Sequence, residues 1–184
     1  MKNIILIGVK LTIICMAASL SLGFVNVITS PKIEKNKVIA LQEALAAVNK
    51  AGTPGEEVFV EGNQKVKSYY PVTLANGEIS SYILKLVGEG YAGDLVLLAN
   101  FEKSGKLLAC VLMDNQETPG LGKEAENISY MAKYIGKGDD SSIPAKKTEL
   151  SPEDADAIGG ATITFAGIGN VLSYGADYVK KIGE

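Results

Sequence analysis

The N-terminal part of the chain is one long apolar segment. Residues 4–28 contain a single charged side chain, Lys10. At about 1.5 Å per residue, a helix of this length exceeds the hydrocarbon core of a bilayer, which is roughly 30 Å thick. The pattern predicts a transmembrane helix, with residues 1–30 as a membrane anchor and residues 31–184 as one globular domain.

A cleaved signal peptide is the main alternative to this anchor. Lys2 resembles the charged start of such a peptide, and the small residues between positions 17 and 21 resemble a cleavage site. A retained anchor is favoured because the segment stays apolar beyond them, through Phe24 and Val27. Charge does not orient the segment, since lysines flank it on both sides.

Helix-like and strand-like patterns follow one another in the rest of the chain. Apolar residues recur at helical spacing over residues 38–48, before the turn-forming stretch from Gly52 to Gly55. Strands are predicted at residues 57–60, 66–74, 82–87, 94–101 and 106–113. Two further helices are predicted at 124–135 and 162–182. Consecutive strands between helices indicate an α+β fold, with a mainly antiparallel sheet and flanking helices.

Charge and residue types exclude several functions. The 18 basic and 21 acidic residues are mixed along the chain, so no basic stripe is available and nucleic acid is not an expected partner. No histidine and only two cysteines, Cys15 and Cys110, are present, which leaves no usual ligand set for zinc, haem or an iron–sulfur cluster. We expect no metal site, no catalytic side chain, and redox chemistry only through an organic cofactor.

The most informative local sequence is DAIGGATITFAGIGN, from Asp156 to Asn170. Gly159 and Gly160 lead into the predicted helix, with Thr162 in its first turn. Glycine permits close backbone approach, and a helix N-terminus offers unpaired N–H groups and a partial positive charge. A phosphate group is well placed there. The alternative is that Thr162 only caps the helix, which on local chemistry alone is the more frequent case.

A second candidate segment is the loop from Glu117 to Gly122, directly after a predicted strand. Such a loop can lay peptide planes and a carboxylate against a planar ring, and an ordinary connector is the alternative. The segment from Gly88 to Gly93, GEGYAG, lacks the spacing of a phosphate-binding loop. It predicts a turn or bulge that borders the site.

These motifs occur together in a known family. An N-terminal span, GYAG, a hairpin, ETPGLG and a D-x-x-x-GAT element before a C-terminal helix resemble the FMN-binding domain family over nearly the whole chain. The resemblance is strongest to the G subunit of Rnf-type ion-translocating ferredoxin:NAD+ oxidoreductases. The related C subunit of sodium-translocating NADH:quinone reductases shares the motifs but is usually longer, so the Rnf type is favoured on length.

The resemblance implies that residues 31–184 form an FMN-binding domain that carries a covalent flavin. A separate flavin transferase takes FMN from FAD and joins its phosphate to the threonine of the GAT triplet, here Thr162. Asp156 matches the acidic position that begins the motif. The remaining residues expected to bind or border the flavin are Gly159, Gly160, Ala161, Glu117, Thr118, Gly120, Leu121 and Gly122.

The resemblance also implies a location and partners. The chain is expected to be an electron-transfer subunit with no substrate turnover of its own, in contact with other membrane subunits of its complex. Membrane lipid would surround residues 4–28. The soluble domain would lie on the extracytoplasmic side of the cytoplasmic membrane.

The sequence departs from the family pattern at three positions, of which Gly159 and Asn115 support a flavin-free alternative. Gly159 stands where the family usually has Ser or Thr, Phe165 where Ser is common, and Asn115 where His is often found. The alternatives are a flavin-free, membrane-tethered interaction module and a stand-alone extracytoplasmic FMN-dependent reductase.

Overall fold

The computed structural model describes residues 2–183 and divides into two compact units, with the division between Leu41 and Gln42. The first unit is helical and belongs to helix α1 (Lys2–Val48). Its apolar side chains from residue 4 onward are largely exposed, and the helix is long and apolar enough to cross a membrane by length and composition. The predicted span is therefore helical throughout.

Helix α1 differs from the prediction at its centre. We predicted an anchor followed by a separate helix over residues 38–48, whereas α1 continues through Pro31 without a break. A proline inside a helix removes one backbone hydrogen bond, and the apolar and helix-favouring residues on both sides outweigh that loss here. The helix ends only at Val48, shortly before Gly52, which has a positive φ of 83°.

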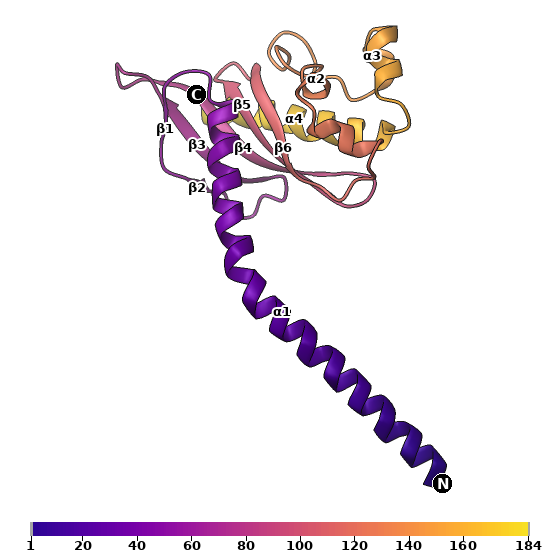
Figure 1. Cartoon of the computed structure of the whole chain (residues 1–184). Coiled ribbons are helices and arrows are strands. Elements are labelled where there is room, and N and C mark those ends of the chain that lie inside the picture. The colour runs from indigo at the N-terminus through magenta and orange to yellow at the C-terminus, as the bar shows by residue number, and fades with distance from the viewer. Residues whose placement is uncertain (1, 184) are drawn as a thin grey trace. The chain divides into compact units, whose positions relative to one another are not determined.

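The second unit is built on a six-stranded antiparallel sheet (Figure 1). Its strand order is β1-β3-β4-β5-β6, with β2 also paired to β3. The strands are β1 (Thr53–Pro54), β2 (Val58–Phe59), β3 (Val66–Thr73), β4 (Ile79–Glu89), β5 (Asp94–Glu102) and β6 (Leu107–Asp114). The four long strands confirm the predicted ones within a few residues, and β1 lies where only a turn was predicted.

Helix α4 (Thr162–Ile182) covers one face of the sheet (Figure 1). Its apolar stripe, which includes Ile168, Leu172 and Val179, is fully buried against alternate residues of β4 and β5. The core cluster on this face contains Leu84, Leu86, Leu95, Leu97, Phe101, Phe165, Ile168, Val171 and Leu172. This packing holds the N-terminus of α4 at one end of the sheet, where the candidate site lies.

The end of α1 that belongs to the second unit contacts the opposite face of the sheet at Val48. Val48 is fully buried, and its carbonyl accepts a hydrogen bond of 3.0 Å from the buried side chain of Asn100 on β5. Both faces of the sheet carry buried apolar side chains, with Leu84 and Leu97 in the core cluster under α4 and Ile83 and Leu98 outside it. The α+β architecture agrees with the prediction.

The predicted helix over residues 124–135 is wrong in extent. The structure has a 3₁₀ helix η1 (Gly122–Glu126), a single α-helical turn α2 (Ile128–Met131) and further turns. Of the apolar face predicted for this helix, Met131 is buried, whereas Ile128 is 82% exposed. Tyr130 and Tyr134, which were not part of that face, also enter the core.

Two short helices between residues 147 and 157 were not predicted. They are η2 (Lys147–Glu149) and α3 (Pro152–Ala157). The start of α3 has a recognisable signal, since the Ser151 side chain caps it and Pro152 occupies its first turn.

Candidate functional site

Thr162 is the first residue of α4 and does not cap it. The N-cap position is held by Ala161, and no side chain within residues 2–183 caps this helix. The Thr162 side chain is exposed. The alternative that Thr162 serves only as a helix cap is therefore wrong. A 21-residue helix that begins without a cap presents its first N–H groups and its partial positive charge to whatever lies beside Thr162.

The Gly159–Gly160 turn sets the direction from which the chain enters α4. Gly159 has a φ of +54°, the left-handed region that glycine adopts without strain. Its carbonyl accepts a hydrogen bond from the Lys147 ammonium group. Just before the turn, Ile158 is buried in the core, while Asp156 at the end of α3 is exposed. The turn is thus attached to the core on one side and leaves Thr162 accessible on the other.

The loop after β6 places a carboxylate beneath this helix start. Glu117 is only 4% exposed. One of its oxygens accepts hydrogen bonds from the backbone N–H groups of Tyr91, at 2.8 Å, and Ala92, at 3.1 Å. The other accepts a hydrogen bond of 2.7 Å from the Thr164 hydroxyl. The predicted glycine-rich turn between β4 and β5 therefore does border the site, through a side chain of the ETPGLG loop.

A cavity of about 470 Å³ lies where these three segments meet. Seven of the residues predicted from the motifs line it: Glu117, Thr118, Leu121, Gly122, Gly160, Ala161 and Thr162. Gly120, Gly159 and Asp156 do not line it. The lining is completed by Tyr91, Ile163 and Thr164, which were not among the predicted site residues. Tyr91 lies in the GYAG segment, which was predicted to border the site, and Ile163 and Thr164 directly follow the GAT triplet.

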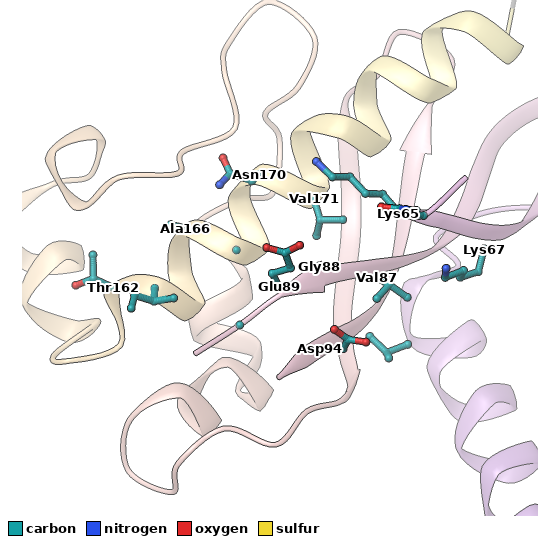
Figure 2. A pocket seen from close by; sticks show the side chains of 15 residues that line it. Lys65, Lys67, Val87, Gly88, Glu89, Asp94, Thr162, Ala166, Asn170 and Val171 are labelled. Atoms are coloured by element: carbon teal, nitrogen blue, oxygen red, sulfur yellow. The ribbon is translucent and has the colours of Figure 1, made fainter. Parts of the chain in front are cut away.

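A second, larger cleft of about 720 Å³ runs along α4 (Figure 2). It lies between α4 and the ends of strands β3, β4 and β5, and Figure 2 shows Thr162 at one end of it and Lys65 and Lys67 toward the other. Thr162 and Ile163 line both cavities. The Thr162 side chain therefore stands at the border between them.

An aromatic cluster supports the site from the core. Tyr134 stacks on Phe165 with ring centroids 5.0 Å apart, and its hydroxyl donates a hydrogen bond of 3.0 Å to the Phe165 carbonyl. Burial raises the pKa of the neighbouring Tyr130 to about 12, and the charge of Glu117 adds to this effect. Burial also raises the pKa of Tyr134, so both phenols are neutral at physiological pH.

The two cysteines are not paired. Both are free, Cys15 exposed on α1 and Cys110 buried in the core. Burial raises the pKa of the Cys110 thiol from 9.0 to about 12, so this thiol is neutral and unreactive near pH 7. Within residues 2–183, no three or more Asp, Glu or Cys side chains come together in a group that could hold a metal ion.

Residues 90–177 match the model of the FMN-binding domain family. The match contains the turn with Tyr91, the ETPGLG loop and the start of α4. It therefore covers the whole lining of the smaller cavity.

Relatives with similar sequences belong to ion-translocating oxidoreductases. The chain is 29% identical to the G subunit of the proton-translocating ferredoxin:NAD(+) oxidoreductase complex of Clostridium ljungdahlii, over 89% of this chain and 84% of that protein. It is 27% identical to the G subunit of the Na(+)-translocating ferredoxin:NAD(+) oxidoreductase complex of Acetobacterium woodii, over 89% and 85%. The C subunit of the Na(+)-translocating NADH-quinone reductase of Yersinia pestis is 29% identical, over 72% of this chain and only 56% of that protein.

The fold also has a counterpart among solved structures. The crystal structure of Shewanella oneidensis NqrC matches with a TM-score of 0.50 and 19% sequence identity, over 76% of this chain and 72% of that one. At this identity the comparison concerns the fold alone, and it agrees with the α+β architecture.

Proposed function

We propose that this protein is a flavin-carrying electron-transfer subunit of a membrane-bound, Rnf-type ferredoxin:NAD+ oxidoreductase complex, with FMN joined through its phosphate to Thr162. The observation that carries the proposal is the exposed Thr162 side chain at the uncapped N-terminus of α4, on the border of two cavities. The two G-subunit relatives, which match along most of both chains, support the type of complex.

The residues present fit FMN. The phosphate of a group bound to Thr162 would lie at the open N–H groups of α4, which favour an anion. The cavity of about 470 Å³ falls within the usual range of small-molecule sites, roughly 300–1,000 Å³. Its wall offers apolar surface from Leu121 and Ile163 together with a few polar groups, as planar cofactors require.

Attachment requires an external catalyst. The Thr162 oxygen would form a bond to the phosphorus of the FMN half of FAD, the pyrophosphate bond would break, and AMP would leave with the electron pair. The hydroxyl proton must pass to a base, because a threonine hydroxyl is a weak nucleophile at neutral pH. The chain has no histidine, and among residues 2–183 no carboxylate or lysine side chain is hydrogen-bonded to Thr162. A flavin transferase therefore supplies the base.

The role of the attached flavin is to accept and donate electrons between neighbouring centres of the complex. The chain's own residues would orient the cofactor through the α4 terminus and enclose one side of it with the ETPGLG loop. A covalent bond prevents loss of the cofactor. The chain performs no substrate turnover of its own in this role.

Helix α1 anchors the protein, and the soluble domain would face the extracytoplasmic side. The apolar helix and the membrane-complex relatives together support the anchor. The Rnf type is preferred to the quinone reductase type because the C-subunit relative is matched over only 56% of its length, against 84% for the Clostridium ljungdahlii G subunit.

The test is to co-express the full chain with a flavin transferase and to denature it completely. In-gel flavin fluorescence and intact mass would then report covalent FMN. We expect retention in the parent, loss in Thr162→Ala, and retention in Thr148→Ala, which removes an exposed threonine outside both cavities. A parent without bound flavin, or a modified Thr162→Ala variant, would refute the assignment.

A further inference from the structure

The buried Glu117 carboxylate joins three segments that are far apart in the chain. One of its oxygens accepts hydrogen bonds from the backbone N–H groups of Tyr91 and Ala92, and the other accepts one from the Thr164 hydroxyl. Its own backbone N–H donates a hydrogen bond of 3.0 Å to the Asn115 side chain. We call Glu117, Tyr91, Ala92 and Thr164 the Glu117 cluster. Both carboxylate oxygens are thus bound within the protein rather than left to solvent.

Two glycines make room for this carboxylate. A Cβ atom built on Gly90 would collide with one Glu117 carboxylate oxygen, and a Cβ atom built on Gly122 would collide with the other. Neither glycine has a positive φ. Backbone conformation therefore does not require glycine at these positions, whereas the space occupied by Glu117 does. Gly90 and Gly122 therefore pack directly against the Glu117 side chain.

The cluster controls the first turn of α4. Thr164 is two residues after Thr162, is 1% exposed, and lies in the turn whose N–H groups have no side-chain cap. Its hydrogen bond to Glu117 fixes how the first turn is rotated about the helix axis. Because the carboxylate holds Thr164 inward, Thr162 is left on the outer side, where its side chain is exposed.

We propose that Glu117 is a positioning residue that locks the Tyr91 turn, the ETPGLG loop and the first turn of α4 into one rigid frame, and so presents the Thr162 hydroxyl for modification. This inference rests on the proposed attachment of FMN to Thr162. It differs from the expectation that the Glu117 side chain lies beside the flavin ring, because here the carboxylate acts through Thr164 and the backbone.

Two variants of Glu117 separate a positioning role from an effect of the negative charge. Glu117→Ala removes all three hydrogen bonds. Glu117→Gln keeps a carbonyl oxygen for Tyr91 and Ala92, and its amide N–H can donate to the Thr164 hydroxyl after that hydroxyl rotates. Thr164→Val tests the α4 link alone. Val179→Ala, a core truncation at the far end of α4, is the stability control, because Val179 is fully buried and lies in neither cavity.

The first measurement is amide hydrogen exchange of the full chain in detergent before any flavin is attached. In Glu117→Ala, the amides of Tyr91 and Ala92 should exchange roughly 10- to 100-fold faster, as expected when a hydrogen bond to a charged group is lost. They should stay protected in Glu117→Gln and Val179→Ala. Unchanged exchange in Glu117→Ala would show that the frame does not depend on this side chain.

The second measurement is the rate of covalent FMN incorporation by a transferase at saturating FAD. Glu117→Ala and Thr164→Val should be slower by on the order of 100-fold, a typical effect of misplacing a reacting group by about 1 Å. Glu117→Gln and Val179→Ala should stay within a few-fold of the parent. The proposal would be overturned if Glu117→Ala incorporated FMN at the rate of the parent. It would also be overturned if Glu117→Gln were as slow as Glu117→Ala although its Tyr91 and Ala92 amides stayed protected.

The two measurements also separate this inference from the proposed function. A parent that stays unmodified refutes attachment at Thr162, and with it any part of Glu117 in that reaction. If the parent is modified and Glu117→Ala is modified at the same rate, only the positioning role is refuted.

Discussion

Gly122→Ala is the substitution that most directly tests the packing around Glu117. The added Cβ atom would meet the second Glu117 carboxylate oxygen, lie 2.7 Å from the Glu117 Cβ, and lie 2.8 Å from the Thr164 hydroxyl oxygen. All three atoms belong to buried side chains. Neither side chain can move away without breaking the 2.7 Å hydrogen bond between them.

The expected cost combines two effects. Overpacking of a close-packed interior costs about 1–3 kcal/mol, and the lost hydrogen bond to a buried carboxylate adds about 1.5–3 kcal/mol. Because the two relax together, we expect a total of roughly 2–4 kcal/mol. For a domain of this size each kcal/mol lowers the melting temperature by about 2–4 °C. Gly122→Ala should therefore melt about 5–15 °C below the parent.

Two other glycines of the site are matched controls with different physics. Gly160→Ala would bring the new Cβ to 3.2 Å from a terminal carbon of the flexible Leu121 side chain, so we expect a change within about 0.5 kcal/mol. Gly159→Ser meets no atom within 4 Å but must adopt φ +54°, which costs about 1–2 kcal/mol. The assay is thermal unfolding of the full chain in detergent, followed by circular dichroism.

The order of stabilities decides the result. We expect Gly160→Ala to be the most stable of the three variants and Gly122→Ala the least stable. A Gly122→Ala variant as stable as Gly160→Ala would refute it, because the space beside Glu117 would then accept a methyl group.

Two further predictions concern the core beneath the site. Burial holds the pKa of Cys110 at about 12 in the folded chain against 9.0 when unfolded, so the neutral thiol contributes stability below pH 9 that is lost as the pH rises toward 12. The free energy of unfolding, measured with urea at about pH 8 and about pH 10.5 on either side of the unfolded pKa, should therefore be lower at the higher pH. This decrease should be smaller in Cys110→Ala than in the parent. An equal decrease in both proteins would contradict the raised pKa of Cys110. Tyr134→Phe should cost about 1 kcal/mol through loss of its 3.0 Å hydrogen bond to Phe165, and an unchanged urea midpoint would contradict this.

Much of the fold was predictable because its signals are local. The long strands show alternating apolar and polar residues or are continuously apolar, and the apolar residues of α4 repeat at helical spacing over 21 residues. Strand β1 and the region after Gly122 were not predictable in this way. Strand β1 spans only two residues and includes Pro54, so it shows no strand periodicity. The apolar positions of 124–135 fit a helix, although Ile128 is exposed and Tyr130, Met131 and Tyr134 are the residues that reach the core.

The candidate site was predictable as a set of motifs but not as an arrangement. The GAT triplet and the ETPGLG loop identified most of the residues that line the smaller cavity. Thr164 was not among the predicted site residues, because it falls outside the position that matches the threonine of the GAT triplet. Its role depends on Glu117, which is 47 residues away in the chain.

The sequence by itself determined the apolar helix, the succession of strands, the absence of histidine chemistry and the place of Thr162 at the start of the last helix. Each follows from composition or from short-range periodicity, which depend on neighbouring residues only. Only the tertiary structure decided that the carboxylate of Glu117 turns inward, that Gly90 and Gly122 are glycines for lack of space, and that Thr162 stands between two cavities. These properties arise from contacts between distant segments, and burial of a charged group is possible only where those segments supply its hydrogen-bond donors.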